Sequence, residues 1–159
     1  DKLNVDFLSD ESSYNKYFVV PLVDIDSELL SVNDMDSSII LKMDSRKFKQ
    51  LIDQIYSFSD VVKFKSIEDN LFIETDSDET LMKIELTDKN SDIESLTIKN
   101  NLTCSFNTKF IHNMCMFFKI SETIEVKLDD GIPLQIIYKI NDNSSVKIFL
   151  APKMGDDDM

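Results

Sequence analysis

An internal repeat restricts the fold of this chain more than any other feature of the sequence. From residue 38 onward, a strand pattern, a helix pattern and three further strand patterns follow one another, and the same order begins again at residue 102. A fixed order that repeats indicates one supersecondary unit used twice. The sequence therefore predicts an α+β domain of two tandem β-α-β-β-β units, with both helices side by side on one face of a continuous antiparallel sheet.

The first copy of the unit contains a helix predicted from Arg46 to about Phe58, with Asp44 or Ser45 as its N-cap. Hydrophobic residues recur at the spacing of one helical face, which we expect to be buried: Phe48, Leu51, Ile52 and Ile55. The strands of this copy are predicted at 38–43, 61–66, 70–75 and 80–87, and residues 93–98 are predicted as an extended connection.

The second copy repeats this order. Its helix is predicted to begin after Asn107 or Thr108 and to extend to about Lys119. Five hydrophobic residues of this helix are expected to face mostly inward: Phe110, Ile111, Met114, Phe117 and Phe118. The strands are predicted at 102–106, 123–128, 132–140 and 145–150.

Shorter segments flank the repeat. Residues 2–8 and 17–23 are predicted strands, and Pro21 favours an edge position because proline has no N–H to donate to a ladder. Residues 24–37 are acidic and show neither the helical nor the strand period, which predicts a connector. Residues 155–159 are expected to form a disordered acidic tail.

The charge and composition exclude several classes of protein. With 17 basic and 30 acidic residues the net charge is −13, which opposes general attraction to nucleic acid or to anionic membranes. No apolar run approaches the roughly 20 residues of a membrane span. Two glycines are too few for a glycine-rich phosphate loop. Cys104 and Cys115 lie in apolar surroundings, which favours packed, reduced thiols over a disulfide.

Catalytic and metal-binding chemistry is not predicted. His112 is the only histidine, and its sequence neighbourhood offers no evident carboxylate or nucleophile partner, so we expect a surface histidine. The acidic segment 76–78 lacks the glycine and the twelfth-position glutamate of a calcium loop. We therefore predict a protein that is not an enzyme and that has no cofactor or bound metal.

Four stretches together resemble the C-terminal half of a PCNA-type DNA sliding clamp. They are Leu22–Leu30 in the connector, Phe48 with Asp60 around the first helix, Pro133–Ile140 in the penultimate strand, and Phe149–Lys153 at the end. The resemblance extends from about Tyr17 to Lys153. It implies that residues 1–23 are the last strands of a preceding N-terminal clamp domain, that residues 24–37 are the interdomain connector, and that residues 38–154 are the C-terminal clamp domain.

In that family, three subunits close a ring around duplex DNA, with helices inside and sheets outside. The resemblance implies a homotrimeric processivity factor that recruits DNA polymerase and other replication and repair proteins and is placed on DNA by a clamp loader. The compartment would be the nucleus, or a viral replication compartment. Two alternatives stay open: a checkpoint-type clamp subunit of a heterotrimer, and a clamp-fold interaction module that does not encircle DNA.

The resemblance also implies three sites. Partner proteins of the family dock a short peptide in a pocket whose positions here are Leu30, Val32, Pro133, Phe149, Ala151, Pro152 and Lys153. The DNA-facing helix positions are Arg46, Gln50, Lys109 and Asn113, fewer of them basic than is usual in the family. The subunit interface pairs Tyr17, Phe18, Val19 and Val20 with Leu81, Met82, Lys83, Ile84 and Glu85 of a neighbouring subunit.

Overall fold

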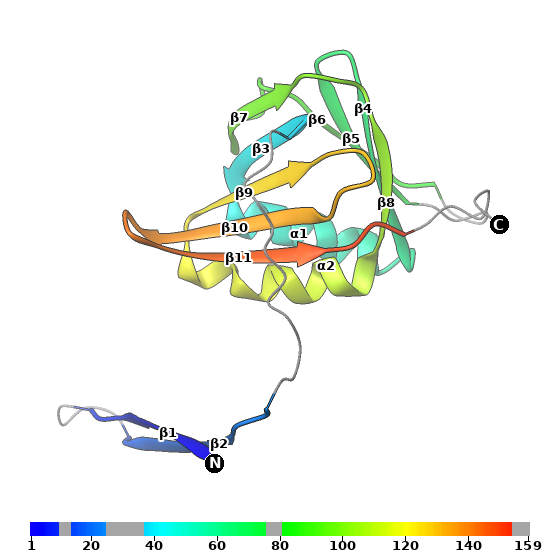
Figure 1. The fold of residues 1–159 in the computed structure, drawn as a ribbon. Helices are drawn as coiled ribbons and strands as arrows, with labels where there is room; N and C mark the ends of the chain where they lie inside the picture. Colours follow the sequence, from blue (N-terminus) through cyan, green and yellow to red (C-terminus); the bar gives the residue numbers. More distant parts are fainter. Residues whose placement is uncertain (10–13, 25–36, 76–80, 154–159) are drawn as a thin grey trace. The chain divides into compact units, whose positions relative to one another are not determined.

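The computed structural model describes residues 1–9, 14–24, 37–75 and 81–153. The chain divides into two compact units, Asp1–Asp34 and Met35–Met159, and each has its own hydrogen-bonded strands (Figure 1). The predicted connector lies largely outside the described residues, as do the predicted acidic tail and the acidic segment 76–78.

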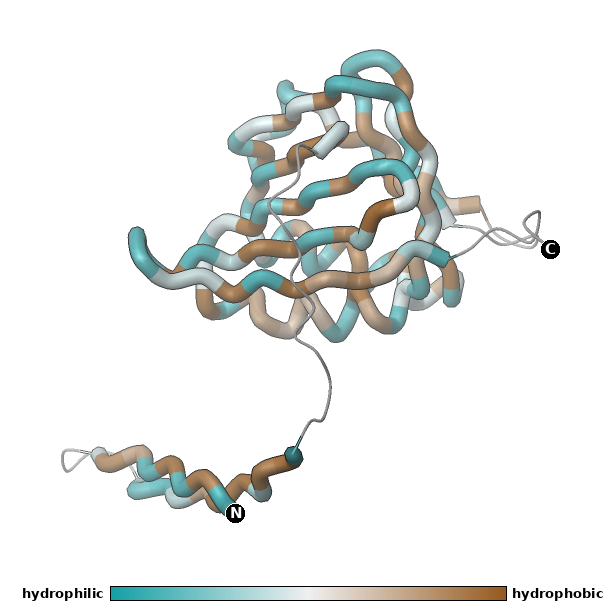
Figure 2. Tube along the Cα trace, viewed as in Figure 1, coloured by the Kyte–Doolittle hydropathy of each residue, from teal (hydrophilic) through white to brown (hydrophobic). Residues whose placement is uncertain are grey.

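The first unit is a β-hairpin. Strand β1 (Lys2–Phe7) pairs antiparallel with β2 (Lys16–Pro21), so that Val5 faces Phe18 across the ladder. Residues opposite each other share a face, and the face that contains Val5 and Phe18 also contains Leu3, Phe7 and Val20. Figure 2 shows the hydrophobic residues along both strands. An isolated two-stranded hairpin is at best marginally stable in water, so this apolar face needs a partner surface.

The second unit contains the predicted repeat. The first copy comprises β3 (Ile39–Asp44), α1 (Ser45–Tyr56), β4 (Val61–Ile67), β5 (Asn70–Thr75) and β6 (Lys83–Leu86), and it is followed by β7 (Ile93–Ile98). The second copy comprises β8 (Thr103–Asn107), α2 (Thr108–Met114), the 3-10 helix η1 (Cys115–Ile120), β9 (Thr123–Leu128), β10 (Leu134–Asn141) and β11 (Ser144–Leu150). The α+β class and the duplicated unit are confirmed.

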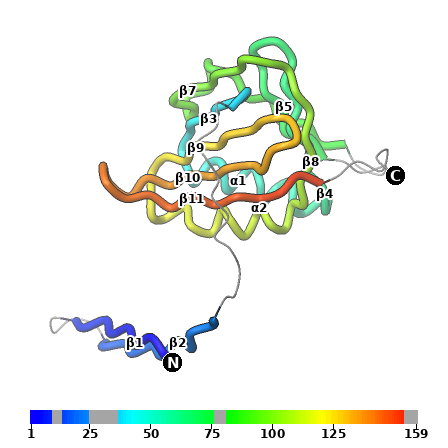
Figure 3. The backbone as a smooth tube through the Cα atoms, viewed as in Figure 1, coloured from blue at the N-terminus to red at the C-terminus, as the bar shows by residue number. Residues whose placement is uncertain are grey.

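The two copies exchange their first strands. Strand β3 pairs with β9 of the second copy, and β8 of the second copy pairs with β4 of the first. Two antiparallel sheets result, with strand orders β11-β10-β9-β3-β7 and β6-β5-β4-β8 (Figure 3). The continuous sheet that we expected is thus divided in two, because the leading strand of each copy joins the ladder of the other. Strand β7, expected only as an extended connection, completes the five-stranded sheet beside β3.

The two helices pack against each other and cover one side of the sheets (Figure 1). Helix α1 begins at the predicted N-cap, where the Asp44 carboxylate accepts a hydrogen bond of 2.8 Å from the backbone N–H of Lys47. Its side chains Phe48, Ile52 and Ile55 are fully buried, as the apolar spacing predicted. In the core between the helices and the five-stranded sheet, the buried Tyr138 hydroxyl donates to the carbonyl of Met114 over 3.2 Å.

The second helix differs from its prediction in two respects. The α-helix ends at Met114 and continues as a 3-10 helix to Ile120, near whose end the carbonyl of Phe118 accepts a hydrogen bond from the Ser45 hydroxyl. Phe110 and Phe117, expected to face mostly inward, are 54% and 47% exposed. Residues 110–120 carry more large apolar side chains than one helical face can bury.

Both cysteines are free and buried, as predicted from their apolar surroundings. Burial raises the pKa of the Cys115 thiol to about 12, and the nearby Asp53 carboxylate adds to this increase. Burial likewise raises the pKa of Cys104 to about 12, with a smaller contribution from Asp130. Among the described residues, no helix is long and apolar enough to cross a membrane.

Candidate functional site

Helices α1, α2 and η1 form one layer, which we call the helical layer. The exposed side of this layer contains the four positions expected to face DNA. Helix α1 runs antiparallel to α2 and η1, because Tyr56 near its end stacks on His112 in α2 while Ser45 at its start contacts Phe118 in η1. The predicted DNA-facing residues are all exposed on this layer: Arg46, Gln50, Lys109 and Asn113. Exposure is what a DNA-facing role requires, and the role itself stays a prediction.

A polar contact joins the two helices in the middle of the layer. The Nε2 atom of His112 lies 3.2 Å from Oδ1 of Asp53, and the His112 ring stacks on Tyr56 with ring centroids 4.5 Å apart. The other carboxylate oxygen of Asp53 pairs with Lys49. The expectation that His112 lacks a carboxylate partner is therefore wrong, because its partner belongs to the other copy of the repeat.

One end of the helical layer is basic. Arg46, Lys47 and Lys49 of α1 and Lys119 of η1 line an open cavity of about 930 Å³, together with the ring of Phe118. Sequence reasoning named only Arg46 of this group and missed Lys47, Lys49 and Lys119. The packing of the start of α1 against the end of η1 brings them together, and no local pattern in the sequence reports that contact.

The expected partner-peptide site lies partly within the described residues. Leu30 and Val32 are outside them. Phe149 pairs with Gln135 in the ladder and is 38% exposed, while Ile148 and Leu150 on either side of it pack against the core.

The segment that follows β11 is anchored to the other sheet. The backbone N–H of Lys153 donates to the carbonyl of Ser105 in β8 over 2.8 Å. Ala151 and Lys153 are exposed, and Pro152 is half-buried. A backbone hydrogen bond therefore holds the end of the described chain against β8.

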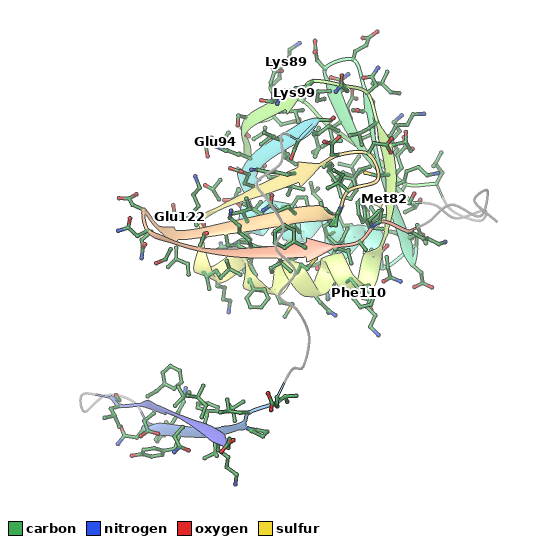
Figure 4. All side chains as sticks on the ribbon, viewed as in Figure 1. Met82, Lys89, Glu94, Lys99, Phe110 and Glu122 are labelled. Atoms are coloured by element: carbon green, nitrogen blue, oxygen red, sulfur yellow. The ribbon has the colours of Figure 1, made fainter. Side chains whose placement is uncertain are left out.

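A shallow cavity of about 280 Å³ lies beside Phe149. Its walls come from α2, η1 and β11, and they include Phe110 and Phe117. Figure 4 shows Phe110 on the side of the helical layer away from the sheets. The other described positions of the expected peptide site, among them Pro133 and Pro152, do not line this cavity. The structure therefore places Phe149 beside the exposed aromatic residues of the second helix.

The two strands expected at the subunit interface both lie at sheet edges. Strand β6 pairs with β5 on one side only, and β2 pairs only with β1, within the residues that the structure describes. Leu81, which precedes β6, is 77% exposed. An open edge with exposed apolar residues is a natural place for strand pairing between chains.

The chain matches a known family. Residues 31–153 match the family model of the proliferating cell nuclear antigen, C-terminal domain. The chain belongs to this family. The family match confirms the resemblance to a PCNA-type sliding clamp.

Two relatives cover nearly the whole chain. The chain is 25% identical, over 99% of its length, to the proliferating cell nuclear antigen of Chaetomium thermophilum, of which it covers 63%. It is 26% identical, over 97% of its length, to a probable DNA polymerase sliding clamp 2 of Paramecium bursaria Chlorella virus 1, of which it covers 57%. The chain therefore spans somewhat more than half the length of these members of the family.

Proposed function

We propose that this chain supplies the connector and the C-terminal domain of a DNA sliding clamp, a processivity factor that encircles duplex DNA and catalyses no reaction itself. The observation that carries the proposal is the strand-exchanged pair of β-α-β-β-β units in a domain of the proliferating cell nuclear antigen family. This arrangement gives the domain one exposed helical side and an open strand edge at β6. A ring needs both features, one toward DNA and one toward the next subunit.

The hairpin of β1 and β2 is proposed to be the end of a preceding N-terminal clamp domain. Its apolar face, which includes Leu3, Val5 and Phe18, needs a covering surface to be stable. The further length of the relatives supplies room for such a domain. The connector would then begin near residue 24, and the C-terminal domain near residue 38.

Subunits are proposed to join through the open edges of β2 and β6 in a homotrimer. Antiparallel pairing between these edges would continue the four-stranded sheet into the next subunit and cover exposed side chains such as Tyr17, Phe18 and Leu81. Pro21 is the last residue of β2, so the hydrogen-bond donor that it lacks falls at the end of the ladder.

Partner proteins are proposed to dock a short peptide against Phe149 and the segment up to Lys153, with Leu30, Val32 and Pro133 completing the site. The partners would include DNA polymerase, other replication and repair proteins, and a clamp loader. The exposed ring of Phe149 and the anchored backbone at Lys153 support this assignment, because apolar pockets beside extended backbone suit peptide recognition. The working compartment would be the nucleus or a viral replication compartment.

The direct test of assembly is the absolute mass of the complete protein in solution. Light scattering over a range of concentrations is expected to give the mass of three subunits at micromolar protein. A mass of one subunit at every concentration would contradict the homotrimer. A trimer that forms only with other clamp-like subunits would instead support the heterotrimeric alternative.

A further inference from the structure

The positive charge of the helical layer is concentrated at one end. Four cations line the 930 Å³ cavity between the start of α1 and the end of η1, and we call them the basic end: Arg46, Lys47, Lys49 and Lys119. The chain has 17 basic residues and a net charge of −13, so a general excess of basic residues does not explain this group. Its position follows from the packing of two elements that are far apart in the sequence.

Three carboxylates, those of Asp44, Asp53 and Glu122, line the same cavity, so four cations face three carboxylates there. Asp44 accepts the backbone N–H of Lys47 as the cap of α1, and Asp53 contacts both Lys49 and His112. The side chain of Lys47 lies 3.9 Å from Asp92, and because both side chains are about half exposed this pair contributes little. The neighbouring carboxylates therefore do not fully neutralise the cations.

Arg46 and Lys119 are the most available members of the group. Both are exposed, and neither forms an ion pair with another residue that the structure describes. Lys49 and Lys119 each place their ammonium group 5.8 Å from the centre of the Phe118 ring. Cations held close together repel each other, and a bound anion removes that repulsion.

The rest of the layer offers little positive charge. Lys109, at the start of α2, is the only Lys or Arg of the helices outside the basic end. This side also carries the neutral, exposed Gln50 and Asn113 and the partly exposed carboxylate of Asp53, and of these Gln50 and Asp53 border the same cavity. A polyanion placed along this side of the domain would therefore be attracted mainly at one end.

We propose that the basic end is the principal phosphate contact of this domain, with the backbone of duplex DNA lying against Arg46 and Lys119. The inference rests on the proposed clamp function, and it changes the footprint expected from the sequence. The sequence predicted DNA contacts at four positions along both helices: Arg46, Gln50, Lys109 and Asn113. The structure instead favours contacts at the cavity between the start of α1 and the end of η1. Contacts of this kind are independent of base sequence, as a sliding protein requires.

The test measures how the affinity of the complete protein for a mixed-sequence DNA duplex depends on salt. The slope of log affinity against log salt concentration falls by about 0.9 for each phosphate contact that is removed. We expect the slope of the double variant R46Q/K119Q to be smaller than that of the unmodified protein by about two for each subunit whose basic end contacts the DNA.

The matched control is K89Q/K139Q, which changes the net charge by the same amount. Lys89 lies in the turn before β7 and Lys139 in β10, and both are exposed. Figure 4 shows Lys89 at the opposite end of the domain from Phe110 and the helices. We expect the control to keep the slope of the unmodified protein. A thermal unfolding curve for each variant checks that all three proteins are folded to the same extent.

The possible results separate this inference from the function on which it rests. If R46Q/K119Q and the control have the same slope while the unmodified protein binds DNA, the basic end is not the contact and the clamp function stands. If K109Q alone lowers the slope as much as the R46Q/K119Q pair, the contact is not concentrated at one end and the inference is overturned. If the unmodified protein does not bind duplex DNA at any salt concentration, the inference is overturned, whereas the clamp function is decided separately by retention of the loaded protein on circular DNA.

Discussion

Asp53 and His112 face each other across the two helices, with 3.2 Å between Oδ1 of Asp53 and Nε2 of His112. They come from different copies of the repeat, and Asp53 also contacts Lys49. One carboxylate therefore engages two basic side chains in the middle of the layer that we propose faces DNA. Its charge opposes phosphate binding directly, and it also occupies a lysine at the basic end.

The substitution D53N is expected to strengthen binding to duplex DNA. The amide keeps the size of the side chain but removes the negative charge, so it lessens phosphate repulsion and leaves Lys49 without a charged partner. We expect an affinity several times higher at low salt, measured by equilibrium titration of the complete protein with a labelled duplex. Glu94→Gln, in β7 of the five-stranded sheet, is the control for the change in net charge. Equal affinities for the two variants would mean that this side of the helices does not face DNA.

Ser45 is expected to contribute measurably to the stability of the domain. Its hydroxyl is buried at the start of α1 and lies within hydrogen-bond distance of the carbonyls of Phe118 and Ser121, which joins α1 to the end of η1. Ser45→Ala leaves those carbonyls without this donor and should lower the free energy of unfolding by about 1–2 kcal/mol.

Urea unfolding measures this loss, and Ser57→Ala provides the comparison. Ser57 is exposed and its hydroxyl donates to the backbone carbonyl of Asp53 in α1 over 3.0 Å, so removal of the hydroxyl should change stability by less than about 0.5 kcal/mol. Equal losses for the two variants would show that the link between α1 and η1 does not stabilise the fold.

The two cysteines are expected to be protected from alkylation in the folded protein. Burial raises the pKa of both thiols to about 12, so at pH 8 on the order of one thiol in ten thousand is ionised. Iodoacetamide at pH 8 should therefore modify neither Cys104 nor Cys115 before unfolding and both after it, as mass spectrometry would report. Rapid modification of the folded protein would contradict the burial of these thiols.

The same pKa increase predicts how stability depends on pH. A thiol whose pKa is higher in the folded state than in the unfolded state binds its proton more tightly when folded, so stability is retained below the unfolded pKa and lost as the pH rises above it. With an ordinary value of 9.0 and folded values of about 12, the loss begins near pH 9. The thermal midpoint should fall between pH 8.5 and 10 by less in C104A/C115A than in the unmodified protein. Equal decreases would show that the thiols do not contribute.

The exposed Leu81 beside β6 is expected to support trimer formation. Leu81→Asp places a charge at a side chain that is 77% exposed in this chain and that we propose is covered by β2 of a neighbouring subunit. The variant should dissociate at protein concentrations at which the unmodified protein is trimeric, as measured by light scattering. Ile140→Asp makes the same change at a residue of β10 that is 53% exposed, and it should leave the mass unchanged. Dissociation of both variants, or of neither, would argue against the proposed interface.

Local features of the fold could be predicted from the sequence because local spacing determines them. The buried face of α1 follows from the 3.6-residue recurrence of Phe48, Ile52 and Ile55, and the start of the helix follows from Asp44 as its cap. The second helix was harder to predict, because Phe110 and Phe117 are as hydrophobic as the buried Ile111 and only the packed structure shows which face is covered.

Relationships between distant segments could not be predicted in the same way. The exchange of β3 and β8 between the two copies depends on the pairing of residues 38 to 89 positions apart, which no local pattern encodes. The contact of Asp53 with His112 and the convergence of Lys119 on the start of α1 depend on the same packing. The expected peptide site could be placed only in part, since Leu30 and Val32 lie outside the described residues.

Retention of the complete protein on circular DNA tests the clamp function most directly. The protein is loaded by its clamp loader onto nicked circular DNA attached to beads and then washed at about 0.5 M salt, which weakens phosphate contacts strongly. A closed ring is held by topology, so we predict that the protein stays on the circle through the wash and is released when the DNA is cut once. Loss of the protein from the intact circle during the wash, or retention after the cut, would contradict encirclement.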